Sequence, residues 1–386
     1  MEILFTLMVL CQSVTLAYPQ IQPPIRLDIA KAIETTGECK LSSIADEIRY
    51  VPLEAKKESF IENIEQYAIS NDLILIADKK VGKVMKFDRT GHYLGDMMVK
   101  GKGPKEFIQI DGLDFNSRGE ILVLKDGSAI NIYSENGDLL KGFHYYGYST
   151  GRWLTDDKIL LVMDYLVSAG KVLVILDKNG KELAVPLKTP LDLSAASMRT
   201  HYRISSCAEG YYYFDALFDT VYTINKKGEV YPRCVFLHRK DHVTQKEMLT
   251  TSVKGPPLSV SSDLAISGQK YEILNYFDYK DKILLSGSVA RNNTVFEFDK
   301  RTGTGISCGK SIYYGLINDL DKGPEFFPVT VLSDGSAAKF LRTQYDLIHY
   351  IDWVFPKSGQ VEKGSYDINL FQKLADYGNP VLMMVK

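Results

Sequence analysis

The chain has 386 residues, of which 45% are hydrophobic and 24% charged, and this balance is typical of a globular protein with a sizeable core. A formal net charge of −2 argues against a nucleic-acid-binding protein, because such proteins usually carry a clear basic excess. The 24 Tyr and 17 Phe residues favour β-strands, where aromatic side chains pack well on a pleated surface.

The first twenty residues, MEILFTLMVLCQSVTLAYPQ, resemble an export signal. Their apolar run at 3–10 is too short to span a bilayer, and a small-residue cleavage site ends at Ala17. The usual basic start is missing, and no other segment is long enough to cross a membrane. We predict a signal at residues 1–17, with lipidation of Cys11 as an open alternative, although Leu10 is bulky for such a site. A buried N-terminal strand is the other interpretation.

Tight-turn motifs recur along the chain at a nearly constant spacing. Each motif ends a strand-like run with two or three polar residues and a glycine, at Gly91, Gly137, Gly180, Gly228 and Gly303. The spacings are 46, 43, 48 and 75 residues, so the last one is a period with an insertion. Another strand-like run precedes each motif, as in RGEILVLKD. A period in the forties with about four strands per unit is typical of a β-propeller.

A weaker sixth unit lies at residues 327–355, and the segment DEIRYVPLE at 46–54 alternates like a strand outside the repeats. A ring must join its first and last blades, because exposed edge strands would template aggregation. We therefore predict an all-β, six-bladed β-propeller over residues 25–356, closed by 46–54 as the outer strand of the last blade. Residues 357–386 are predicted to be a C-terminal extension. Short helices are expected near 42–47, 243–251 and 368–376.

The stretch GKGPKEF at 101–107, shortened to DKGPEF at 321–326, raises the question of a phosphate-binding loop. Such a loop needs the pattern GxxxxGK[ST] between a strand and a helix. Here Lys102 stands between two glycines, and the next residues, IQIDGLDF, look like a strand. The glycines and the proline instead predict an irregular corner between two blades.

With the repeat in view, the unit GKGPKEF…IDGLDFNSRGEILVLKDGSAINIYSENGDLL is similar to an NHL-type propeller repeat, although Lys105 stands where such repeats often have Gly. Together with IRYVPLE and LFDTVYTINKKGEVYP, it makes the chain resemble the exported six-bladed β-propeller family of anaerobic Gram-negative gut bacteria. The resemblance covers roughly residues 25–355. It implies a location in the periplasm or at the cell surface and a role in binding or assembly.

Two arginines and three tyrosines are the candidate ligand-binding residues. Arg152 and Arg203 lie near the start of predicted inner strands, and Tyr148, Tyr202 and Tyr271 occupy similar positions in their units. Arginine pairs bidentately with carboxylates, and tyrosine offers a flat face with a polar tip, so this set suits sugars or peptide ends. The commoner role of such side chains is packing and hydrogen bonding between blades, which makes the ligand role a hypothesis.

Catalytic signatures are missing from the sequence. It contains no G-x-S-x-G elbow and no H-E-x-x-H motif. His238 and His242 could hold a metal from one face of a helix, but a solvated loop is the favoured interpretation. We therefore predict no catalytic residue, no metal ligand and no cofactor, with Ca²⁺ left possible.

Two classes of function remain. The first is a non-catalytic propeller, or scaffold, that binds a glycan, a peptide or an envelope protein. The alternative is a metal-assisted hydrolase or lyase of the lactonase type, acting in the central channel. A cluster of converging carboxylates in that channel would favour the alternative.

The insertion at residues 238–270 is polar, carries Pro256-Pro257 and interrupts the spacing between the fourth and fifth blades. Long loops in compact folds are usually functional or disordered. We expect it to cap part of the channel mouth near Arg203 and Tyr271. Cysteines occur at 11, 39, 207, 234 and 308 without a CxxC pair, so buried free thiols are expected ahead of a disulfide.

Overall fold

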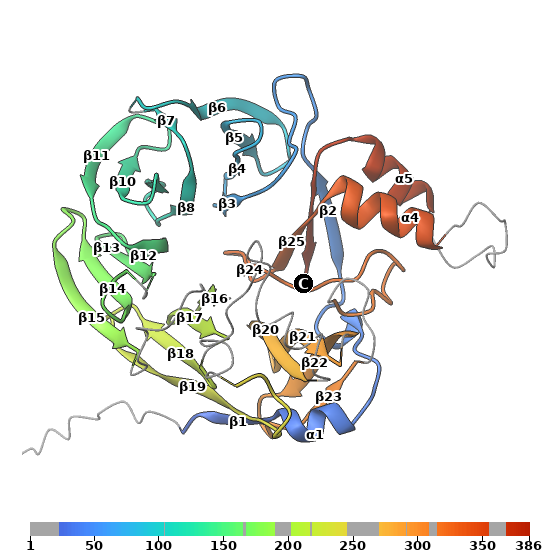
Figure 1. Cartoon of the computed structure of the whole chain (residues 1–386). Helices are drawn as coiled ribbons and strands as arrows, with labels where there is room; N and C mark the ends of the chain where they lie inside the picture. The colour runs from blue at the N-terminus through green and yellow to red at the C-terminus, as the bar shows by residue number, and fades with distance from the viewer. Residues whose placement is uncertain are drawn as a thin grey trace, which may run out of the picture.

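The strands of this chain form six small sheets arranged as a ring (Figure 1). The computed structural model describes residues 23–103, 105–164, 167–189, 202–216, 218–244, 270–290, 292–308, 315–354 and 368–386. The predicted all-β, six-bladed β-propeller is confirmed. Most of the insertion, including the helix expected near 243–251, lies outside the described residues.

The first three blades are sheets of consecutive strands that pair antiparallel, except that the short β7 pairs with β6 in parallel. Blade 1 consists of β3 (Gln66–Ile69), β4 (Leu73–Asp78), β5 (Lys83–Asp88), β6 (Tyr93–Lys100) and the short β7 (Glu106–Phe107). Blade 2 consists of β8 (Ile110–Phe115), β9 (Ile121–Lys125), β10 (Ala129–Tyr133) and β11 (Leu139–His144). Blade 3 consists of β12 (Tyr148–Thr155), β13 (Lys158–Met163), β14 (Lys171–Asp177) and β15 (Glu182–Lys188).

The next two blades keep the same order, and one of them gains a strand from the N-terminal segment. Blade 4 consists of β16 (Tyr202–Cys207), β17 (Gly210–Asp215), β18 (Thr220–Asn225), β19 (Val230–Leu237) and, parallel to β19, β1 (Ile25–Asp28). Blade 5 consists of β20 (Tyr271–Tyr279), β21 (Lys282–Val289), β22 (Asn292–Asp299) and β23 (Gly305–Ser307).

The sixth blade is assembled from both ends of the chain, with the strand order β2-β26-β25-β24. Its strands are β24 (Thr330–Val331), β25 (Ala337–Leu341), β26 (Val381–Val385) and β2 (Ile48–Pro52). The predicted closure by residues 46–54 is confirmed, and in Figure 1 the blue β2 runs beside the red C-terminal strands.

The boundary expected at residue 356 falls inside this blade, because its third strand is β26. The second half of the expected sixth unit is helical, with η2 (Thr343–Ile348, a π-helix) followed by α4 (His349–Val354). The helix expected near 368–376 is confirmed as α5 (Ile368–Asp376). Helices η2 and α5 pack together through buried Leu347 and Phe371, so they form a lid on the core between blades 5 and 6.

The N-terminal segment, residues 25–53, runs along the outside of blades 4, 5 and 6, and we call it the strap (Figure 1). After β1 it forms α1 (Ile29–Glu34), which the sequence analysis missed although Asp28 caps it by accepting a hydrogen bond from the Lys31 amide. Thr36 then bridges to Ser307 of blade 5. The helix expected near 42–47 is reduced to a single 3₁₀ turn, η1 (Leu41–Ser43).

A disulfide between Cys39 and Cys308 ties the strap to blade 5, with the two Cα atoms 5.2 Å apart. The expectation of buried free thiols is therefore wrong for this pair and holds for Cys234, whereas Cys207 is free but only half-buried. The pairing depends on where the strap lies, and the sequence separation of 269 between the two cysteines hides that proximity.

The core consists of six apolar clusters, one at each interface between neighbouring blades. In blades 1, 2 and 3 the second strand reads as a continuous apolar run, because both of its faces are covered. In β9, for example, Ile121 belongs to the cluster shared with blade 1, and the next residue, Leu122, belongs to the cluster shared with blade 3. This alternation makes every blade depend on both of its neighbours.

The stretch GKGPKEF forms the predicted corner between blades 1 and 2. The backbone amides of Lys102 and Gly103 both donate to the Glu106 carboxylate at 2.7 Å, and β7 pairs with β6. The backbone amides of the loop therefore do bind an anionic group, but that group is the carboxylate of Glu106 in the same loop. The Lys125 ammonium donates to the Glu106 carbonyl and holds the corner from the other side.

Glu106→Ala is expected to lower the free energy of unfolding by about 1–3 kcal/mol, because two charge-assisted hydrogen bonds are lost. Lys102→Ala, at an exposed side chain of the same loop, is the matched control and is expected to change it by less than about 0.5 kcal/mol. Urea unfolding measures both. Equal effects, or nucleotide binding that depends on Lys102, would contradict this interpretation of the corner.

Candidate functional site

The centre of the ring is edged by the first strand of each blade. Three side chains on these inner strands interact electrostatically: Tyr67 of β3, Arg152 of β12 and Arg203 of β16. Both guanidinium groups act on the Tyr67 hydroxyl and oppose the rise in its pKa that burial causes. On one side β24 projects into the centre, and the Ser206 hydroxyl donates to the Val331 carbonyl at 3.3 Å (Figure 1).

Arg203 is held in place by a short chain of polar groups. Its Nε donates to Asn275 Oδ1 at 2.5 Å, and Asn275 Nδ2 donates to Ser286 Oγ at 2.7 Å. The side chain keeps contact with solvent, yet the surrounding blades desolvate the guanidinium and lower its pKa. Tyr67 and Tyr202 partly offset this effect. The Nη1 of Arg203 also donates to the Tyr202 carbonyl at 3.4 Å, so Asn275 and this carbonyl together orient the guanidinium group.

Arg152 lies beside a buried carboxyl group without pairing with it. Its Nη1 donates to the Gly151 carbonyl at 2.9 Å. Burial raises the pKa of the nearby Asp114, and Arg152 counteracts that rise from a distance. Asp114 instead accepts from the Trp153 amide at 2.7 Å and from the Tyr211 hydroxyl at 3.3 Å.

Neither arginine has a counter-ion within 4 Å among the residues that the structure describes. Arg233 and Arg342 show the contrast, because each of them pairs with an aspartate. A partly desolvated cation without a partner carries an electrostatic cost that a bound anion would remove.

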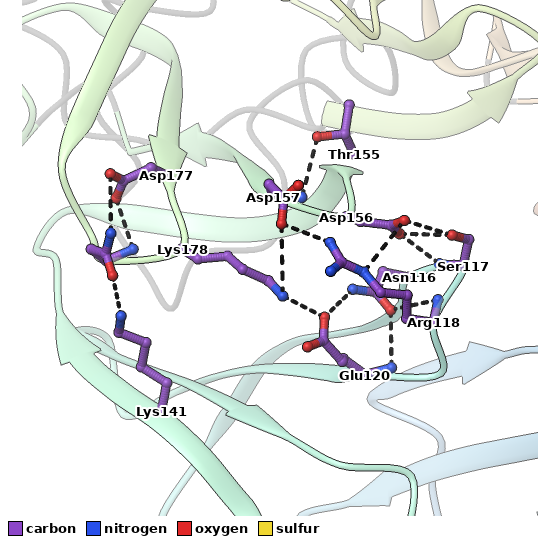
Figure 2. A network of polar contacts seen from close by, with 11 residues as sticks. Asn116, Ser117, Arg118, Glu120, Lys141, Thr155, Asp156, Asp157, Asp177 and Lys178 are labelled. Atoms are coloured by element: carbon purple, nitrogen blue, oxygen red, sulfur yellow. Dashed lines mark hydrogen bonds and ion pairs between the residues drawn. The ribbon is translucent and has the colours of Figure 1, made fainter.

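Figure 2 shows a network of charged and polar side chains elsewhere on the ring, which are joined to one another by hydrogen bonds and ion pairs. It joins the turns of blades 2 and 3: the Arg118 guanidinium pairs with Asp157 at 2.6 Å, and the Lys178 ammonium pairs with Glu120 at 2.6 Å. Lys178 also lies 5.4 Å from the centroid of the Trp153 ring. Because its charges are matched within the protein, the network joins blades and is no candidate for binding a charged ligand.

The other sequence-predicted candidates lie away from this centre, except for Tyr202, which borders Arg203. The Tyr148 side chain is buried, and its hydroxyl donates to the carbonyls of Lys125 and Ala129, so it links blades 2 and 3. Tyr271 is buried between blades 4 and 5, where its hydroxyl accepts from the Arg239 amide at 2.7 Å.

Two residues of the centre, Tyr67 and Asn275, were missed by sequence reasoning. Tyr67 precedes the run NDLILIAD, and this position marks it as an inner-strand residue of blade 1. Asn275 carries no such signal, because only the packing of blade 4 against blade 5 brings it to Arg203.

A hollow that we call the basic groove lies between blades 4 and 5 at the turns of Gly228 and Gly303. Its volume is about 1440 Å³. Its basic lining residues are Arg26, Lys226, Lys227, Arg233, Lys300 and Arg301, against the acidic Glu209 and Glu229. Arg233 and Lys300 pair with Asp278, and the other four are exposed. At the opposite end of β18, His238 and His242 meet Asp219 in a separate cluster.

Comparison with known proteins supports the fold and leaves the ligand open. A protein of Bacteroides fragilis predicted to be exported has a solved structure with a TM-score of 0.68 and 14% identity, over 94% of this chain and 99% of that one. A DUF4221 family member from Bacteroides vulgatus gives a TM-score of 0.49 and 10% identity, over 89% and 96% of the two chains.

At the level of sequence, no curated protein matches the chain. A family model described as "Domain of unknown function (DUF4934)" matches residues 24–386. None of the helices described is long and apolar enough to span a membrane.

Proposed function

We propose that this chain, which belongs to the DUF4934 family, is a non-catalytic envelope protein that binds a carboxylate-bearing ligand at the centre of its propeller. The observation that carries the proposal is the pair Arg152 and Arg203, two guanidinium groups from neighbouring blades that share the surroundings of Tyr67. The ligand is an acidic sugar or a peptide carboxylate, since both present the same planar anion.

The chemistry of the three side chains fits such a ligand. Guanidinium groups recognise carboxylates through paired, charge-assisted hydrogen bonds, and the Asn275 contact fixes the orientation of one of them. Tyr67 packs edge-on against Phe340, with ring centroids 5.2 Å apart, so its ring is a rigid element of the site. A carboxylate bound to Arg203 would replace the hydration that the blades remove from its guanidinium group.

An exported location is part of the proposal, with the periplasm or the cell surface as the compartment. The signal-like character of residues 1–17 supports it, and so does the Cys39–Cys308 disulfide, because disulfides persist in oxidising compartments. The Bacteroides fragilis protein that shares this fold is itself predicted to be exported. A lipid anchor at Cys11 is a further proposal, on residues outside the described part of the chain.

The lactonase-type alternative finds less support. It needs several carboxylates or histidines that converge on an ion at the centre, whereas the described inner strands bring there two arginines and a tyrosine, with the Asp114 carboxyl group beside Arg152. In the described part of the chain, the group with metal-ligand character lies at Asp219, His238 and His242, away from the central arginines.

The test is a binding screen in two arms. One arm compares acidic glycans with the same glycans after reduction of their carboxyl groups, and the other compares peptides with free and amidated C-termini. A ligand that depends on its carboxylate is expected to lose about 10- to 100-fold in affinity with Arg203→Ala or Arg152→Ala, since a hydrogen bond to a charged group is worth about 1.5–3 kcal/mol. Arg203→Lys keeps the positive charge but loses the planar guanidinium group. Its affinity for the ligand is therefore expected to lie between those of the wild type and Arg203→Ala.

Arg301→Ala is the matched control, because it removes an exposed arginine of the basic groove and leaves the centre untouched. It is expected to bind as the wild type does. A ligand whose affinity depends on Arg301 and ignores both central arginines would move the binding site to the groove and overturn the proposal.

A further inference from the structure

Three potential metal ligands meet at the end of blade 4. Asp219 belongs to the loop between β17 and β18, His238 follows β19 directly, and His242 comes one short loop later. One ligand atom from each side chain lies within 4.8 Å of the other two. His238 Nε2 is 3.1 Å from Asp219 Oδ1, and the two imidazole rings are stacked with centroids 4.4 Å apart.

The remaining ring nitrogen of each histidine has a partner. His242 Nδ1 lies 2.8 Å from the Arg239 carbonyl oxygen, and a carbonyl can only accept, so Nδ1 carries the proton and Nε2 keeps its lone pair. His238 Nδ1 lies 3.1 Å from the Tyr271 hydroxyl, which also accepts from the Arg239 amide. Metal-binding histidines usually have this kind of support, because a partner on the second nitrogen fixes the ring and its tautomer.

Segments from two directions hold the cluster in place. His242 forms a β-bridge with Tyr271 at the start of β20, and the Phe236 amide donates to the Asp219 carbonyl at 2.9 Å. The three side chains line a small cavity of about 20 Å³, together with Tyr271 and Glu272. That volume has room for one water-sized species. Asp219 is 53% exposed and His238 13% exposed, so the cavity opens to solvent on the aspartate side.

We propose that Asp219, His238 and His242 bind one divalent transition-metal ion, with Zn²⁺ as the preferred ion. Imidazole nitrogens suit Zn²⁺ and its neighbours, whereas Ca²⁺ and Mg²⁺ prefer sites made of oxygen ligands. Three protein ligands leave at least one coordination position open to water or another donor. The ion would join the β17–β18 loop to the first residues of the insertion and so fix the path of the chain as it leaves blade 4. This proposal is independent of ligand binding at the centre of the ring.

The test uses the full chain with any histidine tag removed and with bound metal stripped by a chelator. Titration with Zn²⁺ against a chromophoric chelator is expected to show one ion per chain, with micromolar affinity or tighter. His242→Ala and Asp219→Asn are each expected to weaken that affinity at least about tenfold. His144→Ala, which removes an exposed histidine of blade 2, is the matched control and is expected to bind Zn²⁺ unchanged.

Two further readouts separate a site from weak surface binding. Co²⁺ is expected to give a visible absorption spectrum that disappears in His242→Ala. Saturating Zn²⁺ is expected to raise the melting temperature of the wild type and of His144→Ala only, because a ligand that binds the folded state stabilises it. Circular dichroism checks that the variants fold. If His242→Ala does not fold, the Zn²⁺ affinity of Asp219→Asn tests the proposal instead. This variant is expected to fold, because it changes one atom of a half-exposed side chain.

Zn²⁺ binding that does not saturate at one ion per chain would overturn the proposal. So would equal binding by the wild type, His242→Ala and Asp219→Asn. The cluster would then be a hydrogen-bonded chain from Tyr271 through His238 to Asp219 that joins two loops without an ion.

Discussion

A chain that begins at residue 56 is expected to be unfolded, or to melt far below a chain that begins at residue 23. The missing segment is the strap, which supplies the outer strand of blade 6 and runs along blades 4 and 5. Its strand β2 pairs with β26 from Ile48 opposite Val385 to Pro52 opposite Val381. Without the strap, β26 and β19 would each become an exposed edge, so aggregation is expected with the loss of stability.

The size of the effect follows from what the strap buries. Nine of its apolar side chains are nearly inaccessible to solvent: Leu27, Ile29, Ala32, Cys39, Leu41, Ile44, Ala45, Val51 and Leu53. At about 1.5–3 kcal/mol for each large aliphatic side chain, their burial contributes on the order of 10 kcal/mol. Whole domains are stable by only about 5–15 kcal/mol, and the faces that the strap covers would be exposed as well.

Two point variants on β2 test the same closure without a deletion. Val51 is 4% exposed in the core between blades 6 and 1, so Val51→Asp is expected to lower the melting temperature strongly, because it buries an unpaired charge. Arg49→Asp, at an exposed position two residues earlier, is expected to change it little. A shortened chain that melts as the longer one does, or two β2 variants with equal effects, would rule out this account of ring closure.

The repeat was readable from the sequence because its determinants are local. A tight turn with a glycine can be recognised from a few neighbouring residues. A strand that is covered on both faces can be recognised as a run of apolar residues. The last blade was harder to read, because its third strand follows two helical segments and lies at the far end of the chain. The Cys39–Cys308 pair was hidden for the same reason, since it depends on a path around the outside of the ring.

The candidate sites also include residues that could be predicted from local sequence and contacts that could not. Arg152 and Arg203 were predicted because the position of an inner strand can be counted from the turns, although Arg152 lies in the middle of β12 and not near its start. Asp219 was not linked to His238, although the hairpin turn at Gly228 lies nearly midway between them in the chain. The pairing of β18 with β19, with Thr220 opposite Val235, is what brings their side chains together. Counting outward from each predicted turn would have found this contact.

The turn glycines have a second role that their conformation alone does not reveal. All five adopt positive φ, between 68° and 96°. In each case, a Cβ atom added to the glycine would point at the preceding blade. At Gly91 it would collide with the Pro52 carbonyl oxygen of β2, and at Gly303 with the Arg26 carbonyl oxygen of β1. At Gly137 the nearest atom is in the flexible Met97 side chain, 3.8 Å away.

Gly91→Ala is therefore expected to destabilise the protein more than Gly137→Ala, although the two glycines have similar φ values of 92° and 86°. Gly137→Ala carries only the cost of a left-handed conformation, about 1–2 kcal/mol. Gly91→Ala carries that cost and must also displace the backbone at the end of β2, two residues before the Glu54 amide that donates to the Gly91 carbonyl at 2.8 Å. Overpacking of this kind costs roughly 1–3 kcal/mol more. Urea unfolding of the two variants measures the difference, and equal losses would mean that β2 is not held against blade 1.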